Sequence, residues 1–403
     1  MRGKTCQEVM EQYVKFVTSK FGGNAVVVFY GYGNVPSVKD HEHKRRQSKL
    51  CRISPDVNLE TTKQILFEQD QFLANSRNKA GFINMLSVTL KQSGIQTQQS
   101  RGDADTDIVG VAIQLASCGH IVTVYCDDTD VLNLLLFHRS QRMCDVFFWS
   151  EGNTRSRGKS ISIRHLQTKL GYDVCQQLLV LHALGGCDTT SSIFGIGKGT
   201  VLTKLGNNTC MRSNIEVMQD VTATQEQVSQ AGLQLLIAAY DGKPSDTLHS
   251  LRYSSYVRLV SASLGRLRPE KLPPSERAGY FHVLRVHLQA VDWKTLSCHT
   301  LLPADWGWKQ DGDHFVPVTT DLPVAPDEIL NVVHCGCKTA CSFALCSCRK
   351  NGLKCMSACR CRSIECENAD NALLPSEVDC YDFDENGIVM DDDIEWVQEE
   401  TVM

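Results

Sequence analysis

The sequence predicts an α/β fold with a mostly parallel sheet in its first half, a helical linker region after it and a small cysteine-rich module near its end. Three short apolar runs, at 25–29, 121–125 and 145–149, are rich in β-branched and aromatic residues and are typical of buried strands. Between the first two, residues 105–117 place their apolar side chains on one face of a helix. Continuous apolar strands that alternate with helices favour a parallel sheet covered on both sides.

The composition indicates more than one domain in the 403-residue chain. An apolar fraction of 42% is enough for a hydrophobic core, and further helical patterns lie at 225–240 and 276–291. The longest apolar run, 131–137, is too short to span a bilayer, and the N-terminus has no apolar signal segment, so we expect an intracellular protein. The predicted parts are an α/β domain at 1–206, a helical region and connector at 207–330, a zinc domain at 331–368 and an acidic, disordered tail at 369–403.

The net charge of −5 hides an uneven distribution. Residues 376–403 hold eleven acidic residues and no Lys or Arg, so the rest of the chain carries a net charge of about +6. A mildly basic body permits nucleic-acid binding, and the acidic tail could compete with DNA for that body.

Nine of the nineteen cysteines lie in the short stretch 335–366. Their Cys-x-Cys pairs suit metal chelation, and an odd number fits poorly with paired disulfides. About three tetrahedral zinc ions would need about twelve bonds, which nine thiolates supply if three of them bridge two ions. The predicted zinc ligands are Cys335, Cys337, Cys341, Cys346, Cys348, Cys355, Cys359, Cys361 and Cys366.

Basic residues surround these cysteines, Arg349 and Lys350 among them, and could face the phosphates of DNA. The alternative is a metal-folded unit with no partner. The cysteine spacing resembles that of the Tesmin/TSO1-like CXC domain, most specifically over 346–355, which reads CSCRKNGLKC. This resemblance implies about three zinc ions, and several members of the family bind DNA. Leu345 stands where the DNA-binding members often carry a tyrosine, and this chain has one module where they often have two.

Five aspartates stand at the predicted ends of strands and helices. One Asp-x-Asp pair opens the helix at 105–117, a second follows the strand at 121–125, and a fifth acid follows an apolar helix at 176–184. Carboxylates at the carboxyl ends of parallel strands repel one another unless cations hold them, and hard oxygen ligands suit Mg²⁺ or Mn²⁺. For any one of them, a helix cap or a turn is the alternative. The candidate catalytic metal ligands are Asp103, Asp105, Asp128, Asp130 and Asp188.

A Gly-x-Gly turn, formed by Gly195, Ile196 and Gly197, follows the last of these acids and leads through Lys198 into an apolar helical pattern. Such a turn presents backbone N–H groups at the start of a helix, which is an arrangement that binds phosphate. The position of its glycines is not that of a Walker A loop.

Together these features resemble the flap-endonuclease/PIN-like nuclease family over about residues 20–206. The likeness rests on 28–31, 102–105, 127–130 and 186–188, with the glycine turn after them. The resemblance implies a PIN-type sheet, two Mg²⁺ ions held by the five aspartates, a glycine turn that grips duplex DNA and a basic helix that steers the scissile phosphate. The residues that match this basic helix are Lys39, Lys44, Arg45 and Arg46, for which a solvated charged face is the alternative.

Two metal-binding carboxylates of that family have no counterpart in this sequence. Tyr30 stands where the family has an aspartate, and no strand that ends in an acid precedes Val26. We therefore expect that the chain begins downstream of the family's first strand and that its metal site is impaired. The order of the parts also resembles a group of uncharacterised animal proteins associated with mobile elements.

The predicted function is that of a nuclear DNA-binding protein with zinc in its cysteine module and Mg²⁺ or Mn²⁺ in a nuclease-like site. Its expected partner is branched or duplex DNA, and its activity would be that of a structure-specific endo- or exonuclease. The alternative is a non-catalytic scaffold that carries the zinc module and binds DNA or protein.

Overall fold

The computed structural model divides the chain into two compact units, Met1–Leu322 and Pro323–Met403. No helix in the described part of the chain is both long and apolar enough to cross a membrane. From position 370 onward, the predicted acidic tail lies outside the described residues. The structure describes residues 2–31, 37–39, 41–42, 45, 53–100, 102–151, 158–206, 208–262, 269–296, 300–312, 314–322, 335–338, 341–342, 345–355, 359–361 and 366–369.

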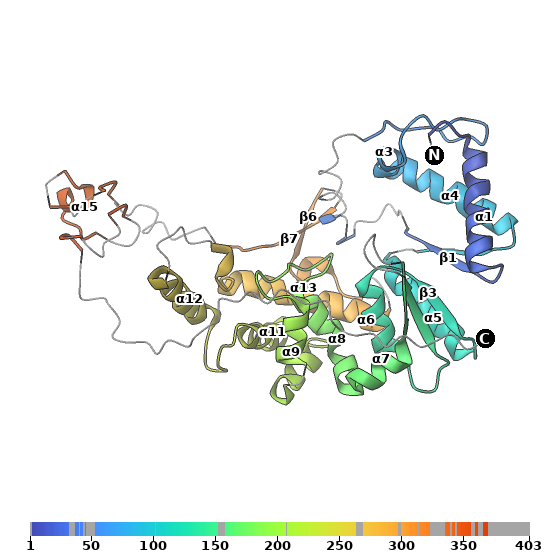
Figure 1. Ribbon diagram of the computed structural model, residues 1–403. Helices are drawn as coiled ribbons and strands as arrows, with labels where there is room; N and C mark the ends of the chain where they lie inside the picture. The colour runs from blue at the N-terminus through green and yellow to red at the C-terminus, as the bar shows by residue number, and fades with distance from the viewer. Residues whose placement is uncertain are drawn as a thin grey trace. The chain divides into compact units, whose positions relative to one another are not determined.

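The first unit begins with three helices beside a two-stranded parallel sheet (Figure 1). These elements are α1 (Cys6–Phe21), β1 (Val26–Phe29), α3 (Gln69–Ala74), α4 (Ser76–Gln92) and β2 (Gln96–Gln99). α1 starts at a capping box, in which Thr5 and Glu8 satisfy each other's backbone N–H groups. Phe72, Phe82 and Leu90 are buried in the core that these elements share.

A three-stranded sheet with flanking helices follows in the chain. Its elements are α5 (Ala104–Ser117), β3 (Val122–Tyr125), α6 (Thr129–His138), β4 (Val146–Ser150), β5 (Lys159–Ser162), α7 (Ile163–Leu170) and α8 (Tyr172–Gly185). β3 pairs in parallel with β4, where Val124 lies opposite Phe148. β5 pairs with the other edge of β4 in the antiparallel direction. The apolar faces of α5, α6 and α8 contribute to one core with β3 and β4.

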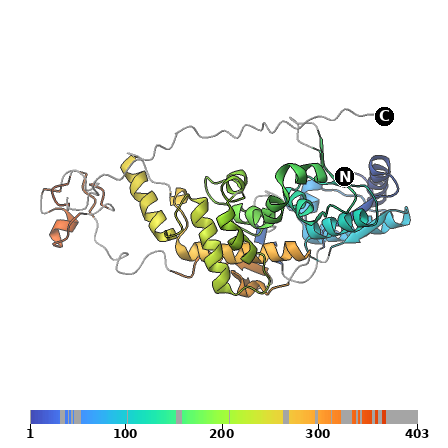
Figure 2. The same ribbon diagram turned by 90° about the horizontal axis from the view of Figure 1, so that it is seen from below.

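Helices dominate the rest of the first unit. They and a short hairpin are α9 (Lys198–Leu205), η1 (Thr209–Met211), α10 (Arg212–Val217), α11 (Gln225–Ala239), α12 (Leu248–Ala262), η2 (Pro269–Lys271), α13 (Glu276–Thr295), η3 (Pro303–Asp305), β6 (Trp308–Asp311) and β7 (His314–Pro317). α13 packs against both α11 and α8 (Figures 1 and 2). The core is continuous across position 206, because Leu184 of α8 and Val283 of α13 belong to the same buried cluster.

The structure confirms the predicted strands at 25–29, 121–125 and 145–149 and the predicted helix at 105–117, within one residue at each end. The architecture is mixed α/β. The continuous, mostly parallel sheet that we expected is not confirmed, because the described strands form separate sheets of two or three and β5 is antiparallel to β4.

The packing of α11 on α13 depends on Gly232. A Cβ atom at this position would lie 2.5 Å from Cβ of Val283. We therefore expect Gly232→Ala to lower the free energy of unfolding by about 1–3 kcal/mol, as overpacked cores do. The matched control is Gly110→Ala in α5, where a new Cβ meets nothing within 4 Å and better helix propensity should add up to about 1 kcal/mol. Thermal unfolding of both variants checks this, and equal melting temperatures would contradict it.

Candidate functional site

Two helix starts position four of the five candidate acids. Asp103 is the N-cap of α5, and its Oδ1 accepts a hydrogen bond from the backbone N–H of Asp105 at 3.1 Å. Asp128 is the N-cap of α6 in the same way, with the N–H of Asp130 at 2.9 Å. The alternative of helix caps is therefore correct for Asp103 and Asp128. Capping uses one oxygen of each carboxylate, so the caps do not exclude a second role.

A lysine ammonium lies between the acids at the start of α5. Nζ of Lys39 is 2.6 Å from Oδ1 of Asp103 and 2.9 Å from Oδ2 of Asp105. All three side chains are buried, and the hydroxyl of Tyr30 donates to Oδ1 of Asp105 at 3.3 Å. For Lys39 this contradicts the alternative of a solvated charged face, and its predicted role in DNA binding stays a prediction. The physical reason is that two neighbouring buried carboxylates require a counter-charge.

The acids influence one another electrostatically. Burial raises the pKa of Asp103 to about 6, and the charge of Asp105 adds to this rise while Lys39 opposes it. Burial also raises the pKa of Asp128, with contributions from the charges of Asp130 and Asp105. The pKa of Tyr30 is raised by burial and then by Asp105. The charges at the two helix starts thus act on one another, and the charge of Lys39 acts on both.

His182 of α8, which the sequence interpretation missed, contacts the fourth acid. Its Nε2 lies 2.6 Å from Oδ1 of Asp130 and 3.0 Å from Nζ of Lys198. Burial opposes ionisation of Asp130, but the hydrogen bond from His182 and the positive charges of Lys198 and Lys39 hold its pKa below the usual value. The available signal was a histidine inside the apolar run of α8, which is more often a core residue than a partner of an acid.

The fifth acid, Asp188, lies in a tight turn after α8. Gly186 has φ +108°, and a Cβ there would lie 2.6 Å from Cα of Ser192, so the turn requires glycine at this position. The hydroxyl of Thr190 closes the turn by donating to the carbonyl of Ala183 at 2.6 Å. Asp188 is half-buried there, at the approach to the glycine turn.

The glycine turn has the predicted relation to a helix. Gly195 has φ +74°, Gly197 is the N-cap of α9, and Lys198 is the first residue of that helix. The turn is exposed, so its backbone can approach a ligand.

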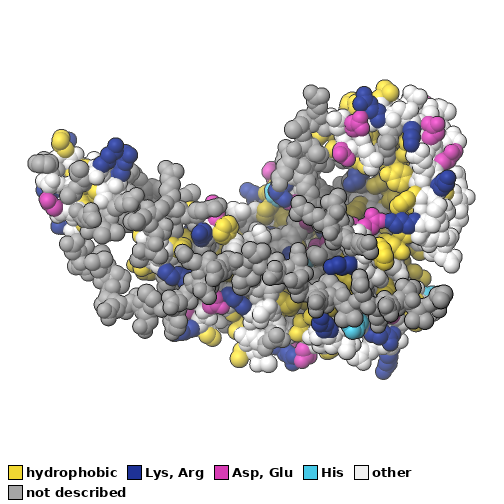
Figure 3. Space-filling model, viewed as in Figure 1, with side chains coloured by type: hydrophobic (Ala, Val, Ile, Leu, Met, Phe, Trp, Pro, Cys, Tyr) yellow, Lys and Arg dark blue, Asp and Glu magenta, His cyan; other side chains and the backbone are white. Residues whose placement is uncertain are grey.

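Of the predicted basic helix, Arg45 is described and exposed, whereas Lys44 and Arg46 lie outside the described residues. Hydrogen bonds to Glu42 raise the pKa of Arg45, and the charge of Asp188 contributes to this rise. Figure 3 shows Lys and Arg side chains spread over the visible face and interspersed with Asp and Glu. Two described members of this set are therefore associated with candidate acids: Lys39 contacts Asp103 and Asp105, and the charge of Asp188 acts on Arg45.

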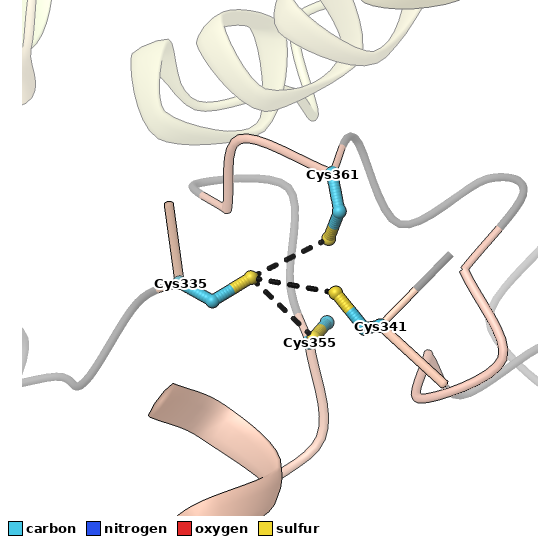
Figure 4. Close-up of side chains that lie close together, drawn as sticks. All are labelled: Cys335, Cys341, Cys355 and Cys361. Carbon is cyan, nitrogen blue, oxygen red and sulfur yellow. Dashed lines mark hydrogen bonds between the residues drawn. The ribbon is translucent and has the colours of Figure 1, made fainter. Parts of the chain in front are cut away.

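The second unit carries the cysteine cluster. Sγ of Cys335 lies 3.6 Å from Cys341, 3.9 Å from Cys355 and 3.7 Å from Cys361, as Figure 4 shows. Four sulfurs about 2.3 Å from a central zinc ion are about 3.8 Å apart in a tetrahedron, so these distances fit zinc. None of the nine cysteines of the module, all of which are among the described residues, forms a disulfide. The cluster could therefore hold zinc.

Three sets of four cysteines have all their sulfurs within 4.8 Å of one another. The described residues yield no such set that contains a carboxylate or a histidine, so the acids around Lys39 are not arranged as a closed metal site. Cys335 belongs to all three sets, and Cys341, Cys346 and Cys355 each belong to two. The sets therefore share cysteines, as bridging thiolates would, but they contain seven of the nine predicted ligands and leave out Cys359 and Cys366.

Local hydrogen bonds shape the module. Asn368 is buried, and its Nδ2 donates to the carbonyl of Leu353 at 2.9 Å and to Sγ of Cys355 at 3.3 Å. Cys346 is the N-cap of α15 (Ser347–Lys350), and the backbone N–H of Arg349 lowers its pKa to about 6. Burial raises the pKa of Cys341, Cys348 and Cys355 in the same cluster. Exposed basic side chains on the module are Lys338, Arg349, Lys350, Lys354 and Arg360.

No protein-family model matches the chain, and no curated protein matches it. Among solved structures, a crystal structure of the T5 D15 protein, co-crystallised with metal ions, matches with a TM-score of 0.32 and 15% identity. The match covers 64% of this chain and 89% of that chain. At such a low TM-score the likeness says nothing about the site residues, whose roles depend on the contacts described above.

We expect native mass spectrometry of the full chain to find about three zinc ions per chain. Because Cys335 is shared by all three sets and Cys361 belongs to one, Cys335→Ser should lower the zinc count more than Cys361→Ser does. Cys118→Ser, which changes an exposed cysteine of the first unit, is the control and should leave the count unchanged. Equal losses for the two module variants, or no zinc in the wild type, would contradict the shared-ligand arrangement.

Proposed function

We propose that the protein binds DNA and carries a nuclease-like divalent-cation site in its α/β body, with a zinc-folded cysteine module. One observation carries this proposal: the ammonium of Lys39 is buried between Asp103 and Asp105 at the start of α5, and its charge also acts on Asp128 at the start of α6. Buried carboxylates that need a positive charge nearby could be balanced by a divalent cation in place of the ammonium.

Asp103, Asp105, Asp128, Asp130 and Asp188 would supply the oxygen ligands for Mg²⁺ or Mn²⁺. Such an ion, when bound, activates water and neutralises charge on a phosphodiester. Tyr30 contributes a neutral hydroxyl beside Asp105, where its raised pKa keeps it protonated. With an aspartate in place of Tyr30 the site would carry one more negative charge. Because that charge is missing, we expect weak cation binding and slow hydrolysis.

Lys39 has to leave the acids before a cation can replace it. A cavity of about 30 Å³ lies beside it, lined in part by Asp103, Thr106, Gln289 and Asp292. This is enough room for about two water molecules. The cavity supports a displacement of the ammonium over a short distance.

Contacts to DNA are assigned to the exposed groups near the acids and on the module. The glycine turn with Lys198 would bind phosphate at the start of α9, and Arg45 would add positive charge near Asp188. On the module, Arg349 and Lys350 are exposed and face solvent from α15. Binding through such groups weakens steeply with salt.

A non-catalytic DNA-binding protein is the second candidate, and the same ion pair favours it. Because Lys39 already balances Asp103 and Asp105, the body can fold without a divalent cation. In this case the acids would serve stability, and the module and glycine turn alone would serve binding.

Replacing Lys39 separates structural from cation-binding roles of the acids. Lys39→Met leaves two buried carboxylates without their cation, and we expect it to lower the free energy of unfolding by about 3–5 kcal/mol. Mn²⁺ should then raise the melting temperature of Lys39→Met more than that of the wild type, because it can take the vacated place. The matched control is Lys63→Met, which removes an exposed pair with Glu60 that is worth about 1 kcal/mol or less. Equal Mn²⁺ shifts for all three proteins, measured by calorimetry, would show that the ion does not bind between the acids.

Cleavage of branched DNA in Mn²⁺ tests the catalytic proposal directly. We expect slow cleavage by the wild type and its loss in Asp105→Asn and Asp128→Asn. Asparagine keeps the N-cap of α6, so the second variant should fold. Asp107→Asn, which changes another acid in the first turn of α5, is the control and should cleave like the wild type.

Cleavage that is undiminished in Asp105→Asn would point to a contaminating nuclease and sink the catalytic proposal. Salt-sensitive DNA binding without any cleavage would favour the non-catalytic candidate. The absence of both would leave only the zinc module.

A further inference from the structure

His182 is a polar residue inside a buried stretch of α8, and both of its ring nitrogens have polar neighbours. It is 7% exposed, between Leu181 and Ala183, which are also buried. Nδ1 lies 3.1 Å from Nδ2 of Asn133 in α6. Nε2 lies 2.6 Å from Asp130, also in α6, and 3.0 Å from Lys198 in α9. The ring thus connects three helices at the edge of the acidic region.

The neighbours of Asn133 determine which ring nitrogen carries hydrogen. Nδ2 of Asn133 is 2.9 Å from the carbonyl oxygen of Thr129, which only accepts hydrogen bonds, so this atom is the amide nitrogen and not the amide oxygen. Its second hydrogen points to Nδ1 of His182. Nδ1 is therefore the acceptor, and the hydrogen of the ring is on Nε2, from which it is donated to Oδ1 of Asp130.

This tautomer has a consequence for Lys198. An ammonium group only donates, and a nitrogen that carries hydrogen has no lone pair to offer it. Lys198 therefore gains no hydrogen bond from the ring 3.0 Å away, although its charge stabilises the ionised form of Asp130. Lys198 is exposed at the first position of α9, next to the glycine turn, where its ammonium can reach an anion.

We infer that His182 is a positioning residue, and that its Nε2 acts both on the cation ligand Asp130 and on Lys198, which would bind phosphate. It fixes Oδ1 of Asp130, so that the other carboxylate oxygen remains for a divalent cation, and it leaves the ammonium of Lys198 for a backbone phosphate of DNA. The amide of Asn133 and the carboxylate of Asp130 together select the tautomer that does both. This inference rests on the proposed function, and it names a backbone phosphate held between Lys198 and the cation as the group recognised.

The indole ring of Trp293 also restricts the position of the His182 imidazole. The indole of Trp293 in α13 lies 5.7 Å from the imidazole between ring centroids, at an interplanar angle of 42°. Trp293 is buried, so the ring of His182 has little freedom to turn away from Asp130. Orientation by such a partner of a metal ligand typically contributes a factor of about 10–100 in metal affinity.

The test combines a spectroscopic and a binding measurement on the zinc-loaded full chain. Long-range ¹H–¹⁵N spectra of ¹⁵N-histidine-labelled protein report the tautomer, with His182 assigned from the signal lost in His182→Gln. Electron paramagnetic resonance of free Mn²⁺ gives the affinity of the cation, and fluorescence anisotropy gives the affinity for a labelled branched DNA. Asn133→Ala keeps His182, Asp130 and Lys198 and removes only the amide, and alanine favours the helix.

We expect hydrogen on Nε2 in the wild type, partial transfer to Nδ1 in Asn133→Ala, and an Mn²⁺ affinity about tenfold lower in that variant. DNA affinity should fall as well, because Nε2 without hydrogen accepts from Lys198 and withdraws it from phosphate. Gln176→Ala, which changes a side chain of α8 that contacts the carbonyl of Phe137, is the control and should match the wild type.

Hydrogen on Nδ1 in a wild type that binds Mn²⁺ would overturn the inference and leave the proposed function intact. Unchanged Mn²⁺ affinity in Asn133→Ala would do the same. A wild type that binds no Mn²⁺ would overturn the proposed cation site, and the positioning role with it.

Discussion

The burial of one ammonium between two carboxylates is the constraint around which the acidic edge of the body is arranged. Lys39 meets Asp103 and Asp105 across 64 and 66 positions of the chain, so this contact joins the segment after β1 to the start of α5. Removing three charges from water costs several kcal/mol for each ion, and their mutual contacts offset that cost only when the geometry is close. Tyr30 donates a hydrogen bond to Asp105 beside this contact, and the charges of Asp105 and Lys39 both act on Asp128.

Local features of this structure follow from the sequence, and distant contacts do not. The strands β1, β3 and β4 and the helices α5, α11 and α13 have strong apolar patterns, and their bounds are close to those expected. β2 could not be predicted in this way, because its sequence Gln96-Thr97-Gln98-Gln99 has no apolar residue and it forms by pairing with β1. α1 and α4 were missed as well, since their burial depends on a core that the two helices create together.

The cysteine module could be predicted from local sequence, whereas the contacts of the acidic site could not. All nine cysteines of the module lie within a short stretch, so spacing alone indicated a metal cluster, and the sulfur distances now fit zinc. In the body, the Asp-x-Asp pairs were visible in the sequence, but their partners were not. Lys39 is paired with acids more than sixty positions away, and His182 is in contact with Asp130 at a separation of 52. Neither pairing leaves a local pattern, because each depends on how helices pack.

The first acid of each Asp-x-Asp pair caps a helix and is also a candidate cation ligand. This double role limits which substitutions related sequences could accept at these positions. Asp103 and Asp128 cap helices, so a lineage that gave up hydrolysis would still be expected to retain Asp, Asn, Ser or Thr at these positions. Asp105 and Asp130 are not N-caps; Asp105 is held by Lys39 and Tyr30, and Asp130 by His182. Drift at the second and not the first acid of each pair would therefore be the mark of relatives that have become binding proteins.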